Sequence, residues 1–210
     1  MNTDPVAACS AAGKAAQERY AAKDVAGMLV VAEAGIAEAL RAADANADLA
    51  PELRRAAKKL AYNVAAKGGP GWGDEGIVID AEIVARGLSL AEQSRALVLK
   101  LDLGDRERGT ADWLVGALEM AAARTEAAIN AFDEACAAFR AARAEAQVLM
   151  AEGYRALARK LAAPEDEAAA DDFAAACRRL AELGSKEAGF FRHQLLTADE
   201  ILAARLRKPS

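Results

Sequence analysis

The chain has 210 residues, 28% of them charged, and a formal net charge of −5 at pH 7. A chain of this length can form one sizeable domain with its own hydrophobic core, without disulfides or metals. Basic and acidic residues are interspersed, which argues against nucleic-acid binding, because phosphate backbones are bound by clustered Lys and Arg. We find no secretory signal pattern and no apolar run of the roughly 20 residues that a membrane span needs, so we expect a cytoplasmic protein without membrane contact.

Alanine dominates the composition, and the other common residues include leucine, glutamate and arginine, all strong helix formers. Runs of β-branched residues are nearly absent. Small residues also let neighbouring helices approach closely. The sequence therefore predicts an all-α protein with about nine helices and no sheet.

Helix caps and chain breaks, taken in order, divide the chain into four hairpins and a last helix. Asp4 and Pro5 start the first helix, and a glycine-rich stretch with Pro70 interrupts the chain at 68–73. Asp74 follows as the predicted cap of a long helix, and Gly184 ends the eighth helix. The expected hairpins, in a single domain, are about 4–46, 51–101, 108–143 and 145–184, followed by a capping helix at 186–207.

The hairpin at 110–139 has the clearest pattern. Its first helix carries Trp113 and Leu118 and its second carries Phe132 and Phe139, in apolar stripes at i, i+3, i+4 spacing. Neither helix can bury its stripe alone, so this hairpin needs neighbours. No glycine or proline separates it from the next helix, whose boundary we place between 139 and 145.

Four segments share a spacing in which a small residue is followed four residues later by a mostly bulky one and seven residues later by a mostly small one. They begin at Gly27, Gly76, Ala128 and Ala169. Small positions permit close helix contact, while a bulky residue fills the groove between hairpins. The pattern indicates a repeated helical hairpin.

This spacing resembles the tetratricopeptide repeat (TPR), most closely at 110–139, where Gly116 precedes Ala128 by twelve residues. Residues 60–65 are similar to a first helix of that family. The chain departs from the family because Trp113 is one position off the expected tryptophan and Asp80 takes a bulky position. The four segments are also spaced more widely than the family repeat of about 34 residues. The resemblance implies stacked antiparallel hairpins in a TPR-like α-solenoid; the alternative is an ordinary antiparallel helical bundle.

A TPR-like solenoid implies a concave groove lined by the first helices, here 51–67, 108–123 and 145–163, that takes a peptide or partner helix. Two polar pairs at i, i+4 spacing stand on such helices. They are Lys59 with Asn63 and Arg155 with Arg159. They are similar to the carboxylate clamp of chaperone-binding TPR domains, which implies an acidic segment as partner. The alternative is that these residues form a solvated face.

Trp72 lies in the glycine-rich stretch 68–76 and is the second candidate contact. An aromatic side chain flanked by glycines can anchor a protein interface, or it can fold back onto the hairpin beneath it. The glycines alone do not predict a nucleotide site, because the Lys-Ser/Thr ending of a phosphate-binding loop is missing.

The sequence gives no reason to expect an enzyme, a cofactor or a metal. His193 is the single histidine. Cys9, Cys136 and Cys177 are widely spaced and lie among alanines, so we interpret them as small buried residues. We therefore predict a protein-protein interaction or scaffolding module. The alternative is a closed bundle that binds a small ligand, or an enzyme whose site only tertiary structure assembles.

The last helix carries a further expectation, because it holds four large apolar residues close together. They are Phe190, Phe191, Leu195 and Leu196. Such a face could pack against a second copy of the chain.

Overall fold

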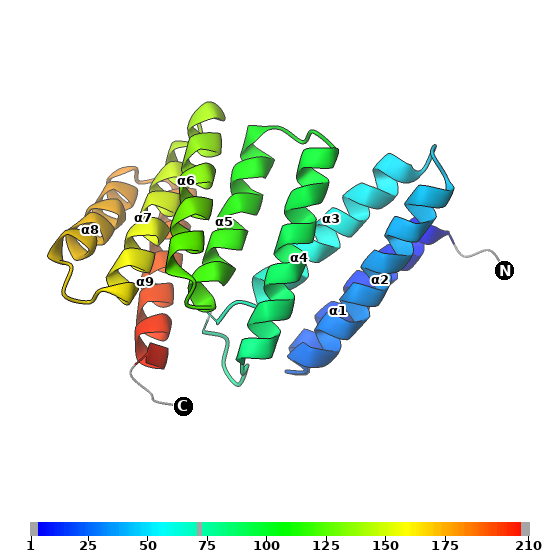
Figure 1. Cartoon of the computed structure of the whole chain (residues 1–210), viewed down its shortest axis with the longest axis horizontal. Coiled ribbons are helices and arrows are strands. Elements are labelled where there is room, and N and C mark those ends of the chain that lie inside the picture. Colours follow the sequence, from blue (N-terminus) through cyan, green and yellow to red (C-terminus); the bar gives the residue numbers. More distant parts are fainter. Residues whose placement is uncertain (1–3, 71–72, 207–210) are drawn as a thin grey trace. The chain divides into compact units, whose positions relative to one another are not determined.

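The computed structural model describes residues 4–70 and 73–206, and this part of the chain is all-α, with nine helices and no strand (Figure 1). The helices are α1 (Pro5–Ala21), α2 (Val25–Ala45), α3 (Ala50–Lys67), α4 (Ala81–Lys100), α5 (Asp105–Ala121), α6 (Thr125–Ala141), α7 (Glu145–Ala162), α8 (Glu167–Glu182) and α9 (Lys186–Leu206). The predicted fold class is confirmed, as is the helix boundary expected between 139 and 145. No described helix combines the length and the apolar character needed to cross a membrane.

The helices group into two compact units. Unit 1 contains α1 to α4, and unit 2 contains α5 to α9 with the described part of the segment 69–75. In unit 1 each helix packs against the next one in the chain, and α1 also lies along α3. In unit 2 the helices α5 to α8 pack in chain order, and α9 packs against α7 and α8. Within each unit, antiparallel hairpins therefore lie side by side.

The turns after α1, α5 and α6 share one backbone geometry without using glycine, and the turn after α4 has the same left-handed conformation at Asp102. The backbone φ is 63° at Lys23, 58° at Ala123 and 54° at Arg143, all in the left-handed region. In the turn after α5, the Ala123 N–H donates to the Met120 carbonyl at 3.0 Å and the Arg124 N–H to the Glu119 carbonyl at 2.9 Å. This pair of bonds is the Schellman motif, which satisfies carbonyls at the helix end.

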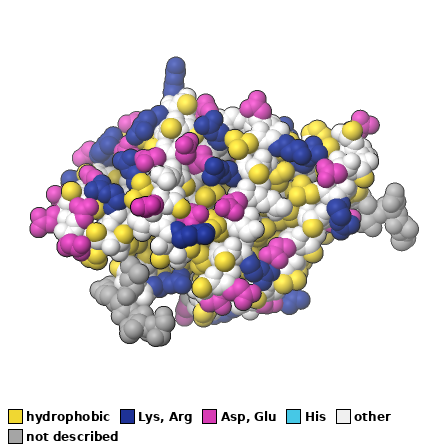
Figure 2. All heavy atoms as spheres, viewed as in Figure 1, with side chains coloured by type: hydrophobic (Ala, Val, Ile, Leu, Met, Phe, Trp, Pro, Cys, Tyr) yellow, Lys and Arg dark blue, Asp and Glu magenta, His cyan; other side chains and the backbone are white. Residues whose placement is uncertain are grey.

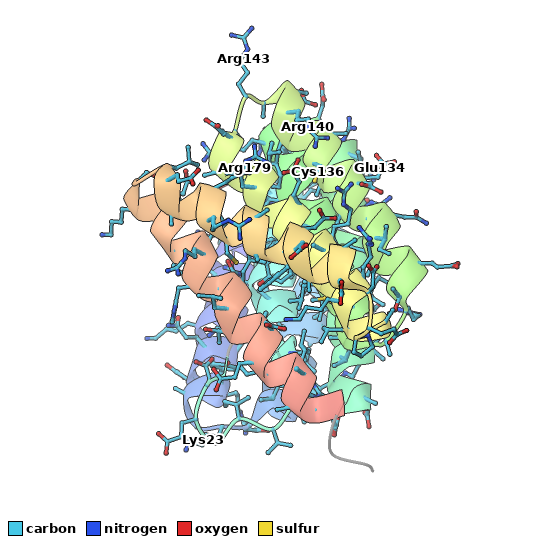
Figure 3. All side chains as sticks on the ribbon, turned by 90° about the vertical axis from the view of Figure 1, so that its left-hand side faces the viewer. Lys23, Glu134, Cys136, Arg140, Arg143 and Arg179 are labelled. Atoms are coloured by element: carbon cyan, nitrogen blue, oxygen red, sulfur yellow. The ribbon has the colours of Figure 1, made fainter. Side chains whose placement is uncertain are left out.

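The same joint recurs at a fixed interval in unit 2. Helices α5, α6 and α7 begin at Asp105, Thr125 and Glu145, so each helix with its turn takes the same length of chain. At the second of these joints, the Arg143 side chain extends away from the protein (Figure 3). The backbone therefore forms this joint, and the Arg143 side chain takes no part in it.

Replacing Arg143 with glycine should stabilise unit 2. Glycine relieves a left-handed strain of roughly 1–2 kcal/mol, while its greater freedom in the unfolded chain offsets about 0.5–1 kcal/mol. We expect Arg143→Gly to raise the free energy of unfolding by about 0.5 kcal/mol in urea titrations. The matched control, Ala137→Gly at an exposed position inside α6, should lower it by about 1 kcal/mol. Equal effects of the two changes would contradict this account.

Two glycines of α5 let the aromatic rings of α6 approach its backbone. A Cβ built on Gly116 would lie 2.7 Å from the Phe132 ring, and one on Gly109 would lie 2.7 Å from the Phe139 ring. Both rings are fully buried. The partners run in opposite directions along the two helices, as an antiparallel hairpin requires.

Gly116→Ala should destabilise the protein, because the new methyl group overlaps a buried ring in a close-packed core. Overpacking costs typically about 1–3 kcal/mol, which outweighs the roughly 1 kcal/mol by which alanine favours a helix. In thermal and urea unfolding we expect a net loss of about 1 kcal/mol or more. Gly13→Ala is the control, since its Cβ would lie at an ordinary 3.6 Å from Leu60. The control should leave stability unchanged or raise it.

The predicted start of α4 is wrong. Asp74 does not cap this helix, which begins at Ala81 with Asp80 as its N-cap, and the Ile83 N–H donates to Asp80 Oδ1 at 2.8 Å. The backbone at Gly76 has a φ of 72°, a left-handed conformation that a helix starting at Glu75 could not contain. Asp80 is therefore a capping residue rather than a bulky core position.

Two of the four proposed repeat copies are also wrong. The copy at Gly76 lies mostly before α4, and in the copy at Gly27 the position expected to be small and packed, Ala34, is exposed. The copies beginning at Ala128 and Ala169 do place their small and bulky residues in the core, including Phe132 and Phe173. The shared spacing therefore describes α6 and α8 only.

Candidate partner-binding surface

Helix α3 owes its limits to local sequence. The Asn46 side chain accepts hydrogen bonds from the Asp48 and Leu49 N–H groups at 3.1 and 3.3 Å, which shapes the turn before the helix. Pro51 stands in the first turn, where its missing N–H is harmless, and Gly68 ends the helix. One face of α3 is buried through Ala50, Leu53, Ala57, Leu60, Ala61, Val64 and Ala65. The opposite face is therefore left to solvent.

Three polar residues line this outer face. Arg55, Lys59 and Asn63 are all exposed and follow each other at i, i+4, i+8, which places them on one side of the helix about 6 Å apart along its axis. We call them the α3 stripe. The predicted pair Lys59 and Asn63 thus shares a face, and Arg55 extends that pair by one further turn.

The remaining cations of α3 contact other residues of unit 1, two of them in other helices and one within α3. Arg54 Nη2 lies 3.0 Å from Asp44 Oδ1, Lys67 Nζ lies 3.7 Å from the centre of the Tyr20 ring, and Lys58 stands over the Tyr62 ring. Arg55 and Lys59 have no hydrogen bond, ion pair or ring contact within the described residues. Two positive charges of the α3 stripe are therefore exposed and without a partner in the part of the chain that the structure describes.

The second predicted pair has a different environment on α7. Arg155 Nη1 lies 2.5 Å from Asp133 Oδ1 of α6. Arg159 reaches Asp166 Oδ2 at 3.1 Å and Asp172 Oδ2 at 3.0 Å, at the start of α8. The hydrogen bond with Asp133 raises the pKa of the Arg155 guanidinium, with burial opposing it. Both arginines thus bind carboxylates of the same chain.

These contacts belong to a larger ion-pair network over α6, α7 and α8. Glu152 of α7 accepts from Arg140 of α6 at 2.6 Å and from Arg179 of α8 at 3.3 Å. On the face seen in Figure 2, acidic and basic side chains lie beside each other over these helices. Single exposed pairs contribute only about 0–1 kcal/mol each, but a network holds several charges in place. We call this set the α7 network.

Asp166 couples the α7 network to the start of α8. Its Oδ1 accepts from the Ala169 N–H at 3.0 Å, so it caps the helix, while Oδ2 faces Arg159. The Ala169 N–H is the main reason that the pKa of Asp166 lies below its ordinary value, and Arg159 adds to the effect. The charged form is therefore the one that the fold stabilises.

Asp166→Asn tests this charge, because asparagine can keep the cap bond. A carboxyl whose pKa is lowered by folding stabilises the protein above its unfolded pKa, about 3.9, and loses that effect as pH falls through the lowered value. The variant should be less stable than the parent from about pH 5 upward, and the difference should shrink below about pH 4. Urea unfolding across this range measures it. Asp171→Asn, which removes the same charge from an exposed position of the same helix, is the control.

The structure describes four of the five predicted contact residues. Lys59 and Asn63 lie in unit 1 and Arg155 and Arg159 in unit 2, and each pair occupies one helix face. Trp72 lies outside the described residues; next to it, a Cβ on Gly73 would lie 2.8 Å from the Ile201 side chain of α9. Sequence reasoning missed Arg55, although its spacing of four residues before Lys59 was a sufficient signal.

The other reactive side chains are either buried or isolated. Cys9, Cys136 and Cys177 are buried, and burial raises the pKa of Cys136 to about 11. His193 stands exposed on α9. Among residues 4–70 and 73–206, no group of three or more His, Cys, Asp or Glu side chains is arranged to hold a metal ion.

Comparison with known proteins found no family model that matches this chain, and no curated protein or solved structure matches it.

Proposed function

We propose that this protein is a helical-repeat, TPR-like interaction module that binds an acidic, extended peptide segment along α3. The observation that carries the proposal is the α3 stripe, whose two cations lack partners among the described residues while the arginines of α7 are ion-paired. An exposed row of unsatisfied charges on a rigid helix is a ready contact for the opposite charge.

The spacing of the α3 stripe suits an extended peptide. Arg55 and Lys59 are one helical turn apart, about 6 Å along the axis. In an extended chain, side chains on one face recur every second residue, about 6.5–7 Å apart. Two carboxylates separated by one residue would therefore meet the two cations together.

Asn63 adds a neutral contact at one end of the α3 stripe. The Asn63 side-chain amide offers both a hydrogen-bond donor and an acceptor. It therefore matches a peptide bond better than a further charged side chain would. Solvent-exposed ion pairs contribute about 0.2–1 kcal/mol each, so we expect weak, salt-sensitive binding in which charge selects the partner.

Fluorescence anisotropy with a labelled peptide of six alternating Asp-Ser pairs tests the proposal. The intact protein should bind it, and Arg55→Ala/Lys59→Ala should bind about tenfold more weakly, because two ion pairs are lost. Raising the salt concentration from about 50 to 500 mM should reduce binding of the intact protein far more than that of the variant.

Lys100→Ala/Arg143→Ala is the matched control, because it removes the same charge from exposed positions that are not part of the α3 stripe. It should bind the peptide like the intact protein, and so should Arg155→Ala/Arg159→Ala once circular dichroism shows that it folds. Equal losses in the stripe variant and the control would show attraction by net charge alone and would reject α3 as the binding surface.

A further inference from the structure

Helix α9 is held to unit 2 by polar contacts on its inner side. Glu187 Oε1 accepts from Arg106 of α5 at 3.1 Å and from Gln147 of α7 at 2.9 Å. Further along, Asp199 binds Lys160 of α7 through both carboxylate oxygens, at 2.9 and 2.8 Å. These contacts fix the orientation of α9, so the position of its outer face is defined.

The apolar face expected from sequence is only partly exposed. Leu195 is fully buried and packs onto Gly153, where a Cβ would lie 2.6 Å from it, so Leu195 cannot contact a second copy. Phe191 is half-buried, with its ring 5.9 Å from that of Phe190. Phe190 and Leu196 remain, with 60% and 40% of their surfaces exposed.

Five exposed residues form a single stripe along the outer face of α9: Lys186, Phe190, His193, Leu196 and Glu200. We call them the α9 stripe. Their spacings of three or four residues keep them on one side of the helix. Apart from the ring contact of Phe190 with Phe191, none of the five contacts another described side chain through a hydrogen bond, an ion pair or a ring.

The α9 stripe is complementary to itself when reversed. Lys186 and Glu200 lie seven residues on either side of His193, and Phe190 and Leu196 lie three residues on either side. Placed antiparallel on a second α9 with the two His193 residues opposite each other, each Lys186 meets a Glu200 and each Phe190 meets a Leu196. The same surface then serves both copies, as a two-fold dimer requires.

Gly189 gives an independent indication. Glycine inside a helix is less stable than alanine, and at Gly109, Gly116 and Gly153 a packed side chain occupies the space of the missing Cβ. At Gly189, on the exposed side of α9, a Cβ would meet nothing within 4 Å. A helix from outside the chain that packs closely here explains why no side chain is present.

We propose that two copies of this protein pair through antiparallel α9 helices about a two-fold axis at His193. The paired helices bury Phe190 and Leu196 between them and place an ion pair at each end. The pairing uses no residue of the α3 stripe.

Cysteine crosslinking tests the axis. Helices that pack with axes about 8–10 Å apart bring directly facing Cα atoms within about 3–6 Å, which overlaps the range that disulfides span. Under mild oxidation, His193→Cys should therefore form a covalent dimer with itself. The three native cysteines are buried and provide a low background.

Glu200→Cys is the matched control on the same exposed face. In the antiparallel pair its two copies would lie about 21 Å apart, too far for a disulfide. Crosslinking at 193 and not at 200 supports the axis. Equal crosslinking at both positions, or none at 193, overturns it.

A charge exchange tests the pairing without cysteines. In sedimentation equilibrium, Lys186→Glu and Glu200→Lys should each weaken dimerisation about tenfold, because each places like charges at both ends. The double variant should return to within about twofold of the intact protein, since the opposite charges meet again.

Rescue cannot arise inside one chain, because residues 186 and 200 are about 21 Å apart along the helix, beyond two Debye lengths in physiological salt. A double variant as weak as the sum of the single changes would overturn the proposal. So would an intact protein that stays monomeric at about 0.5 mM, a concentration at which even weak pairs associate.

Discussion

The contact between the aromatic rings of α6 and the glycines of α5 places the other helices of unit 2. Because Gly109 and Gly116 have no side chains, Phe139 and Phe132 pack directly against the α5 backbone. Tyr154 of α7 then stacks beside Phe132, with ring centres 5.7 Å apart, and burial raises its pKa. Leu195 of α9 in turn fills the space above Gly153 of α7. A small residue facing a large one is thus the packing rule from α5 to α9.

Helices could be predicted where local chemistry marks their ends. Asp4, which accepts the Val6 N–H at 3.0 Å, and Gly184 act as their residue types suggest. Asp74 and Asp80 offer the same capping signal before the same apolar stretch, and only the backbone at Gly76 decides between them. The repeat copies at Gly27 and Gly76 failed because a small–bulky–small spacing does not say which side of a helix faces the core.

The candidate contact residues could likewise be predicted only in part from the sequence. Spacing of four residues does place Lys59 with Asn63, and Arg155 with Arg159, on single helix faces. Whether a charged side chain forms an ion pair within the chain depends on residues from other helices, such as Asp133 for Arg155 and Asp172 for Arg159. Sequence spacing cannot reveal those partners, because helix packing brings them together. The free charges of the α3 stripe could therefore be recognised only in the structure.

The recurring joint of Lys23, Ala123 and Arg143 has a consequence for how such a chain can change length. Backbone hydrogen bonds form the joint, and it requires no glycine, so it depends little on the side chains that flank it. In α5 and α6 each helix and its joint occupy equal lengths of chain. A tandem duplication of the segment 105–144 would therefore add a whole hairpin with its connection already formed.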